Sequence, residues 1–337
     1  MLRGAIIGLG NIAVRGHVPA YRLDGMGSRM QIVAVTDVVE HNREKAGEHL
    51  PGARFYLDIQ SLLEHEQLDF VDICTPPHTH AEYIRACAVK GINIICEKPL
   101  TERIDLIVEV VKNIKDSNIV FVPCHQYKYS PLWKSIKEMI SSGKLGKVTL
   151  AQFNVYRLQA DSGTAAWNPQ WRTSKNQSGG GILVDTGAHY FYLAQYFFGM
   201  PQKVSALLRT LKHHDYRVED TAVVTLEYPD MLMQVNLTWA ASQRANSVYI
   251  AGTEGSLSYD GVKLFYANAD GTKEIPMPDV SDKRQYIVWY SELFNEFSCR
   301  VEVKNYSTDL LDEAVNVMKL LNMSYQSSEQ RAVLDVP

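Results

Sequence analysis

The sequence predicts an α/β protein: a doubly wound parallel sheet, followed by an α+β domain with a large, open and mostly antiparallel sheet. In the first third, continuous apolar runs alternate with helical patterns, which is typical of parallel strands covered on both faces. After about residue 124, short stretches of alternating polarity follow one another, which indicates antiparallel strands. A length of 337 residues also favours two domains, which we place at residues 1–123 and 124–337.

The first domain is expected to contain strands and helices in alternation. The expected strands are residues 4–7, 32–36, 70–75, 92–96 and 119–122. The expected helices are residues 11–23, 39–50, 78–90 and 103–116, each to within a few residues.

The second domain begins with an expected helix at about 130–142 and a strand at 150–158. Turn sequences such as YPDM (228–231) and GTEG (252–255) separate some of the later strands. Those strands are expected at 204–211, 221–228, 232–239, 247–252, 256–261 and 262–267. Two helices, at about 285–299 and 308–325, complete the pattern.

Composition excludes several classes of partner. The net charge of −4 gives no reason to expect nucleic acid, and no apolar run is long enough to cross a membrane. The N-terminal MLRGAII reaches a glycine too early for a signal peptide, so none is expected, and the five cysteines form no CxxC pair. We therefore expect a cytoplasmic protein with reduced cysteines that pack as small apolar residues, and no metal site.

The first strand runs into GLGNIA, residues 8–13, and then into a helix. This is the G-x-G-x-x-A form of the dinucleotide fingerprint of Rossmann domains. Gly8 would permit the tight turn, and Gly10 would let the backbone approach a pyrophosphate. The amides of Asn11 and Ile12, at the start of the helix, would face the phosphates.

The second strand ends in Asp37, whose carboxylate could accept hydrogen bonds from both ribose hydroxyls and would repel a 2′-phosphate. NAD is therefore expected as the cofactor, and NADP is disfavoured. Arg43 lies too far along the next helix to reverse this preference. The alternative is that Asp37 only caps that helix.

The strand at 70–75 ends in CTPPHTH, at the edge of the sheet that faces the ligand crevice. Thr75 and Pro76 would lie near the nicotinamide, with His80 in the first turn of the next helix. The alternative is a proline-stiffened turn with His80 on the surface.

Two further motifs make the pattern specific: CEKPL (96–100), at the end of the next strand, and GGGILVDTGAHY (179–190). With GLGNIA, TPPHTH and a late GTEGSL turn, they resemble the glucose–fructose oxidoreductase/inositol dehydrogenase/rhizopine catabolism (Gfo/Idh/MocA) family over nearly the whole chain. The resemblance implies a Rossmann domain followed by a domain with an open sheet, which commonly forms dimer or tetramer contacts.

The resemblance also implies a catalytic trio of Lys98, Asp185 and His189, with Glu97 beside the cofactor. His189 would take the hydroxyl proton, assisted by Asp185, and Lys98 would stabilise charge on the reacting oxygen. Asp185 and His189 would share one face of a helix, and the three glycines would let that helix begin close to cofactor and substrate. The alternatives are a surface lysine and a simple contact within a helix.

Substrate contacts are expected from two segments. Gln126 and Tyr127 follow the last strand of the first domain, and Trp167 and Arg172 lie in the loop before the catalytic helix. Aromatic faces suit the C–H face of a sugar, and arginine suits hydroxyls or a carboxylate. Alternatively, the tryptophans of this loop pack the seam between the domains.

Tyr192 is a further candidate substrate contact, and it departs from the family. It stands where inositol-oxidising members carry an aspartate that contacts the polyol, which disfavours inositol but not the polyol class.

The sequence therefore predicts an NAD-dependent dehydrogenase of a secondary hydroxyl of a sugar, glycoside or cyclic polyol. One alternative is a non-catalytic dinucleotide-binding regulator of the same fold. Another is an NAD-assisted glycoside-cleaving enzyme, although DTGAHY does not match the Tyr/His motif of such enzymes.

Overall fold

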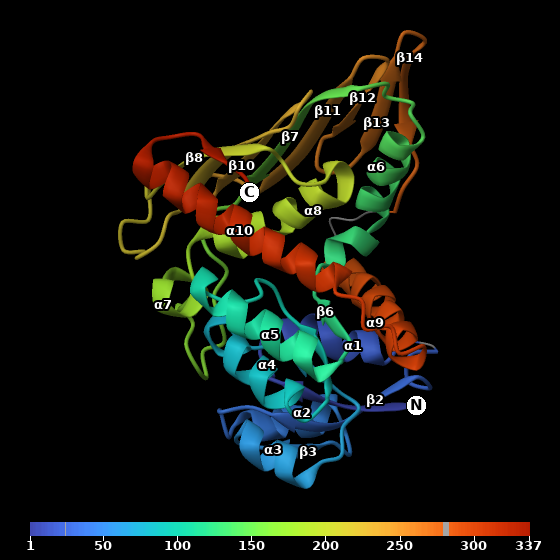
Figure 1. Cartoon of the computed structure of the whole chain (residues 1–337), viewed down its shortest axis with the longest axis vertical. Helices are drawn as coiled ribbons and strands as arrows, with labels where there is room; N and C mark the ends of the chain where they lie inside the picture. Colours follow the sequence, from blue (N-terminus) through green and yellow to red (C-terminus); the bar gives the residue numbers. More distant parts are fainter. Residues whose placement is uncertain (24, 279–282) are drawn as a thin grey trace.

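The computed structural model describes residues 1–23, 25–278 and 283–337, which form two sheets with helices between and around them (Figure 1). The first sheet has six strands in the order β3-β2-β1-β4-β5-β6, and every pair is parallel. This is the strand order of a Rossmann fold, which creates a ligand crevice where the order reverses between β1 and β4.

The strands of the Rossmann sheet are β1 (Leu2–Ile7), β2 (Met30–Thr36), β3 (Arg54–Tyr56), β4 (Phe70–Ile73), β5 (Asn93–Cys96) and β6 (Phe121–Pro123). Its helices are α1 (Val18–Tyr21), α2 (Asn42–His49), α3 (Ile59–His65), α4 (His80–Ala88) and α5 (Ile107–Ser117). The five strands expected from the apolar runs are all present. The expectation missed β3 and α3, because β3 is a three-residue edge strand with no buried residue to mark it.

The second sheet has nine strands in the order β14-β13-β12-β11-β7-β10-β9-β8-β15. Only the pair of β7 and β10 is parallel, so the sheet is mixed and mostly antiparallel. Its strands are β7 (Val148–Tyr156), β8 (Lys203–Arg209), β9 (Thr221–Glu227), β10 (Leu232–Thr238), β11 (Ala245–Gly252), β12 (Gly255–Tyr259), β13 (Leu264–Asn268), β14 (Gly271–Ile275) and β15 (Leu334–Asp335). The edge strands β14 and β15 were not expected, because neither contains a fully buried residue.

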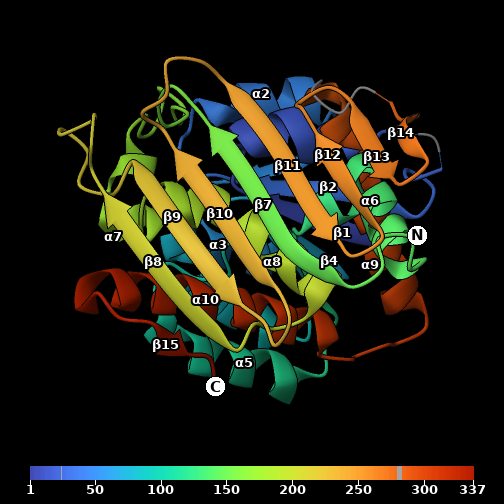
Figure 2. The ribbon, with the colours of Figure 1, turned by 90° about the horizontal axis from the view of Figure 1, so that it is seen from above.

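Helices cover one face of this sheet, and Figure 2 shows the other face open. The helices of the second domain are α6 (Pro131–Ser141), α7 (Lys175–Ser178), α8 (Ala188–Phe198), α9 (Tyr286–Glu302) and α10 (Asp309–Gln330). On β8, β9 and β11, Leu207, Val223 and Tyr249 are exposed. Helix α10 contacts both β8 and β6, so it joins the two sheets.

Helix α9 packs on the Rossmann domain although it lies far from it in sequence. The ring of Phe294 stacks on that of Tyr21, with centroids 4.3 Å apart, and the ring of Tyr290 lies 4.1 Å from that of His17. This packing holds the second domain over the carboxyl ends of the Rossmann strands.

Candidate active site

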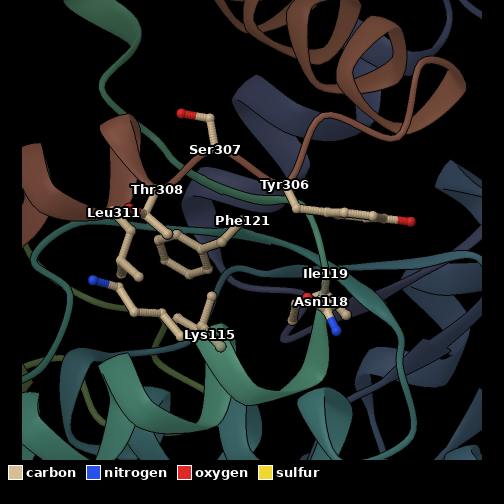
Figure 3. Close-up of a pocket in the computed structure, with 9 residues that line it drawn as sticks. Lys115, Asn118, Ile119, Phe121, Tyr306, Ser307, Thr308 and Leu311 are labelled. Carbon is tan, nitrogen blue, oxygen red and sulfur yellow. The ribbon is translucent and has the colours of Figure 1, made fainter.

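One large cavity of about 1220 Å³ lies where the two domains meet. Its lining includes Gly8, Gly10 and Asp37 from the Rossmann crevice, and Asp185 and His189 from the second domain. The predicted cofactor motif and the predicted catalytic residues, separated by more than a hundred positions, therefore open into the same space. A smaller cavity of about 210 Å³ lies between the end of α5 and the start of α10, and its lining contains no histidine, cysteine or carboxylate (Figure 3).

The glycine turn after β1 has room for a dinucleotide. Gly8 has a φ of +92°, and a Cβ there would lie 2.6 Å from Thr75 Cγ2. A Cβ on Gly10 would meet no atom within 4 Å, so the backbone of Gly10 faces open space. The chain then enters a π-helical turn over Ala13–His17 before α1. Gly8 therefore shapes the turn, and Gly10 leaves the volume that a pyrophosphate needs.

Asp37 is fixed by its own surroundings. Its carboxylate accepts hydrogen bonds from the N–H groups of Leu9 (2.7 Å) and Val39 (2.8 Å), and it lines the cavity. Arg43 does not reach the cavity lining, because it pairs with Glu40 at 2.7 Å on the surface. Lys45 does line the cavity, which the sequence analysis did not anticipate.

Lys98 and Asp185 meet, but not as an ion pair. Lys98 Nζ donates to the main-chain oxygen of Asp185 at 2.5 Å, and the carboxylate of Asp185 accepts from Arg172 Nε at 3.1 Å. Burial opposes ionisation of Asp185, but the charges of Lys98 and Arg172 outweigh it and hold its pKa below the ordinary value. Asp185 is therefore a carboxylate at neutral pH.

His189 is held by two tyrosines. Its Nδ1 lies 2.8 Å from the Tyr192 hydroxyl, and its ring stacks on that of Tyr127 with centroids 4.2 Å apart. Burial, together with the charges of Lys98 and His125, lowers the pKa of His189 well below its ordinary value. The imidazole is therefore neutral at neutral pH and able to accept a proton.

The helix that carries these residues begins differently from the expectation. Leu183–Gly187 form a π-helical turn, and α8 starts only at Ala188. A Cβ on Gly181 would lie 1.9 Å from the main-chain oxygen of Glu219, and the Glu219 carboxylate accepts from the N–H of Gly181 at 3.0 Å. Gly181 itself packs against Glu219, while the turn and helix that follow it bring Asp185 and His189 to the cavity lining.

Gln126 offers an unsatisfied acceptor to the cavity. Its Nε2 donates to the Tyr290 hydroxyl at 3.1 Å, but its buried Oε1 has no hydrogen-bond partner among the described residues. Gln126 is only 3% exposed and lines the cavity. A buried amide oxygen without a partner is costly, so this atom fits a donor of a bound cofactor or substrate.

Beneath the cavity lies a buried network that the sequence analysis did not foresee. His17 Nδ1 lies 2.8 Å from Asp72 and Nε2 lies 3.0 Å from Glu97, while Tyr21 and Tyr290 donate to the same carboxylates. Burial by itself would lower the pKa of His17. The negative charge of Asp72 and its hydrogen bond to His17 outweigh burial, so the pKa is raised well above the ordinary value. Glu97, beside Lys98, is thereby fixed as a carboxylate that holds an imidazolium.

The same residues also come close enough to cysteines to suggest a metal site. Ligand atoms of His17, Asp72 and Cys74 lie within 4.8 Å of one another, as do those of His17, Glu97 and Cys124. Both nitrogens of His17 are already bonded, and burial raises the pKa of the Cys74 and Cys124 thiols. A protonated thiol is a poor ligand, so the network is better described as hydrogen-bonded side chains.

Two predicted contact residues do not reach the cavity lining. His80 is buried, and its ring nitrogens lie 2.9 Å from the Pro99 oxygen and 2.8 Å from the Thr75 oxygen, so it braces the loops that carry the motifs. Tyr192 is also fully buried, behind His189. These positions correct the expectation of direct contact, because both polar groups are occupied within the protein.

The other predicted contacts line the cavity: Asn11, Ile12, Thr75, Pro76, Glu97, Lys98, Tyr127, Trp167 and Arg172. Trp167 is 38% exposed and stacks on His78, which argues against a role as a packed residue of the domain seam. Arg157 and Arg244 also line the cavity, although neither belongs to a sequence motif. In the sequence, the one feature that marks them is their position at the ends of stretches of alternating polarity.

Among the described residues, no helix is long and apolar enough to cross a membrane.

Comparisons with known proteins match both domains. A domain family described as "Oxidoreductase family, NAD-binding Rossmann fold" matches residues 2–125, and the "GFO/IDH/MocA C-terminal domain" matches residues 133–258.

Individual proteins are similar to this chain over most of its length. D-xylose 1-dehydrogenase (NADP(+)) 2 of Haloferax volcanii is 25% identical over 98% of both chains. Myo-inositol 2-dehydrogenase of Thermotoga maritima is 26% identical over 78% of this chain and 76% of its own. The structure of a levoglucosan dehydrogenase in complex with NADH has the same fold, with a TM-score of 0.87 at 21% identity over 100% of this chain and 99% of that one.

Proposed function

Because this chain belongs to the Gfo/Idh/MocA family of oxidoreductases, we propose that it is an NAD-dependent dehydrogenase of a secondary hydroxyl of a sugar, glycoside or cyclic polyol. The observation that carries the proposal is the single cavity lined by the glycine turn, Lys98 and His189. The named relatives, which act on xylose and inositol, support the substrate class.

In the proposed reaction, His189, Lys98 and Asp185 each have a separate role. A dinucleotide held at the glycine turn by Gly8, Gly10 and Asp37 would supply the hydride acceptor for the hydroxyl carbon. The neutral imidazole of His189 takes the hydroxyl proton, and the ammonium group of Lys98 stabilises negative charge on the oxygen. Asp185 assists by keeping Arg172 in place and by balancing the charge of Lys98.

Tyr192 positions His189 in this proposal. The Tyr192 oxygen accepts a hydrogen bond from the N–H of Tyr127 at 3.2 Å, and the same oxygen lies 2.8 Å from Nδ1 of His189. When the proton of the neutral imidazole is on Nδ1, the basic nitrogen is Nε2. The phenol is thus a positioning group for the base.

NAD rather than NADP is proposed because Asp37 lines the cavity and Arg43 does not. The unsatisfied Oε1 of Gln126 would accept from the nicotinamide carboxamide or from a substrate hydroxyl. Lys45 is the residue that would oppose this preference, since it also lines the cavity and its ammonium group could hold a 2′-phosphate. A comparison of NAD and NADP binding by calorimetry, in wild type and Lys45→Ala, tests the preference directly.

A homodimer or homotetramer is proposed through the open face of the second sheet, where Leu207, Val223 and Tyr249 are exposed. Light scattering coupled to gel filtration measures the assembly, and a Val223→Glu variant is expected to reduce it. A monomeric wild type would contradict the proposal.

The central test is NADH formation with a panel of sugars, glycosides and cyclic polyols. Activity is expected with at least one member, and Lys98→Ala and His189→Ala are each expected to lower kcat by two or more orders of magnitude. Unchanged activity in either variant would remove that residue from the mechanism. Tight NAD binding without turnover on any member would favour a regulator instead.

A further inference from the structure

Two arginines lie opposite each other at the ends of neighbouring strands of the second sheet. Arg157 follows Tyr156, the last residue of β7, and Arg244 precedes Ala245, the first residue of β11. Tyr156 and Ala245 are register partners in this antiparallel pair, so the arginines are opposed one step beyond it. Both line the large cavity.

Neither charge is neutralised within residues 1–23, 25–278 and 283–337. Arg157 Nη1 donates to the main-chain oxygens of Tyr156 (2.8 Å) and Ala245 (3.2 Å) and to Oδ1 of Asn246 (2.8 Å), all of which are uncharged. No carboxylate in those ranges forms an ion pair with Arg157 or Arg244. Burial and the nearby charge of Arg244 lower the pKa of Arg157.

The pair belongs to the reacting end of the cavity rather than to the dinucleotide turn. Arg157 and Arg244 come from the second sheet, in the domain that also brings Asp185 and His189 to the cavity, whereas the glycine turn comes from the Rossmann sheet. Arg172, at the same end, is already paired with Asp185 at 3.1 Å. Arg157 and Arg244 therefore add positive charge to the side of the cavity that the second domain forms.

The geometry points to an anionic substrate: a sugar or polyol whose carboxylate or phosphate binds Arg157 and Arg244 while a hydroxyl lies at His189. Guanidinium groups bind both anions in bidentate fashion, whereas a neutral sugar would leave two like charges facing each other. The inference rests on the proposed dehydrogenase function and narrows its substrate class. The reaction is unchanged, because the hydroxyl carbon still loses a hydride to NAD and its oxygen a proton to His189.

The test compares matched substrates with NAD: glucose with glucuronate and glucose 6-phosphate, and galactose with galacturonate. At least one charged member is expected to have a kcat/KM about tenfold or more above its neutral counterpart. Arg244→Gln is expected to raise KM for that member about tenfold, with kcat little changed, and to change KM for neutral sugars much less. The control is Arg209→Gln, at an exposed strand end outside the cavity lining.

Comparing kcat/KM for the uronates with kcat/KM for glucose 6-phosphate shows whether the site prefers a carboxylate or a phosphate. Equal or better turnover of the neutral members, or an equal effect of Arg244→Gln on both kinds of substrate, would overturn the inference while leaving the dehydrogenase intact. If no sugar reduces NAD, the proposed function fails, and calorimetry of glucuronate and glucose 6-phosphate with NAD-loaded protein decides the anion site. Binding that weakens in Arg244→Gln but not in Arg209→Gln would support it, and no binding of either probe would overturn it.

Discussion

The Nδ1 atom of His189 lies 2.8 Å from the hydroxyl oxygen of Tyr192, three residues further along α8. The same hydroxyl oxygen accepts the N–H of Tyr127, whose ring stacks on the imidazole. His189 is thus fixed on one edge by Tyr192 and on one face by Tyr127, which also lines the cavity. In the proposed mechanism, this arrangement holds the imidazole in place as the base.

Tyr192→Phe is expected to lower kcat about tenfold with little change in KM, because the loss of one hydrogen bond of about 1 kcal/mol frees the imidazole to rotate. Steady-state kinetics with the best substrate measure it. Tyr228→Phe is the control, since it also removes a buried hydroxyl, bonded to the Gly199 oxygen at 3.2 Å, away from the cavity. An equal loss in both variants would assign Tyr192 a purely structural role.

The pH dependence of NAD reduction follows from the depressed pKa of His189. The base must be neutral, so the rate of oxidation is expected to stay flat through neutral pH and to fall only below 6.5, the ordinary value for histidine. Lys98→Met removes a neighbouring positive charge and should raise the pKa of His189. Titration of the His189 ring protons by NMR measures this without activity, and an unchanged or lower pKa in the variant would contradict the assignment.

Asp185→Asn keeps the main-chain oxygen that binds Lys98 but removes the partner of Arg172. We expect kcat/KM to fall about tenfold or more, because Lys98 and Arg172 lose their shared counter-charge and their geometry. The pH below which the rate of oxidation falls should change little, because in the proposed mechanism this pH is set by His189. If the fall of the rate at low pH disappears in Asp185→Asn, Asp185 is the titrating base instead.

A matched pair of glycine variants locates the cofactor. Gly10→Ala is expected to weaken NAD binding about tenfold or more with little change in Tm, because its methyl group would enter open space needed by the pyrophosphate. Gly8→Ala is expected to lower Tm, because φ is +92° and its Cβ would clash with Thr75. Calorimetry and thermal unfolding measure the two effects. Undiminished NAD binding by Gly10→Ala would place the dinucleotide elsewhere.

His17→Gln leaves two buried carboxylates without their cation and is expected to cost about 3 kcal/mol of unfolding free energy at pH 7. The folded-state pKa of His17 is raised, so its stabilisation is full below 6.5 and is lost as pH rises through the folded-state pKa. The deficit measured by urea unfolding should therefore shrink at alkaline pH. His65→Gln, on the exposed face of α3, is the control, and a deficit that grows with pH would refute the charged state of His17.

The sequence was informative wherever a short motif and its structural context coincide. The apolar runs identified β1, β2, β4, β5 and β6, and GLGNIA identified the turn that borders the cavity. It failed at the sheet edges, since β3, β14 and β15 depend on a neighbouring strand rather than on their own apolar pattern.

Side chains whose role depends on distant partners could not be assigned in this way. Tyr192 looked like a substrate contact, yet its hydroxyl is taken up by His189 and Tyr127. No sequence pattern marks His17 as a network residue, because its partners Asp72 and Glu97 lie 55 and 80 residues away in the chain. Arg157 and Arg244 become neighbours only when β7 and β11 pair.

The sequence by itself determined the two-domain architecture, the dinucleotide turn and the membership of Lys98, Asp185 and His189 in one family pattern. Local propensity, apolar periodicity and motif spacing are properties of contiguous residues, so they can be read without a fold. Only the tertiary structure decided which groups pair: Asp185 with Arg172, His189 with Tyr192, and Glu97 with His17. Charge and proton placement depend on distances of a few ångströms between segments that are far apart in the chain, and folding alone sets those distances.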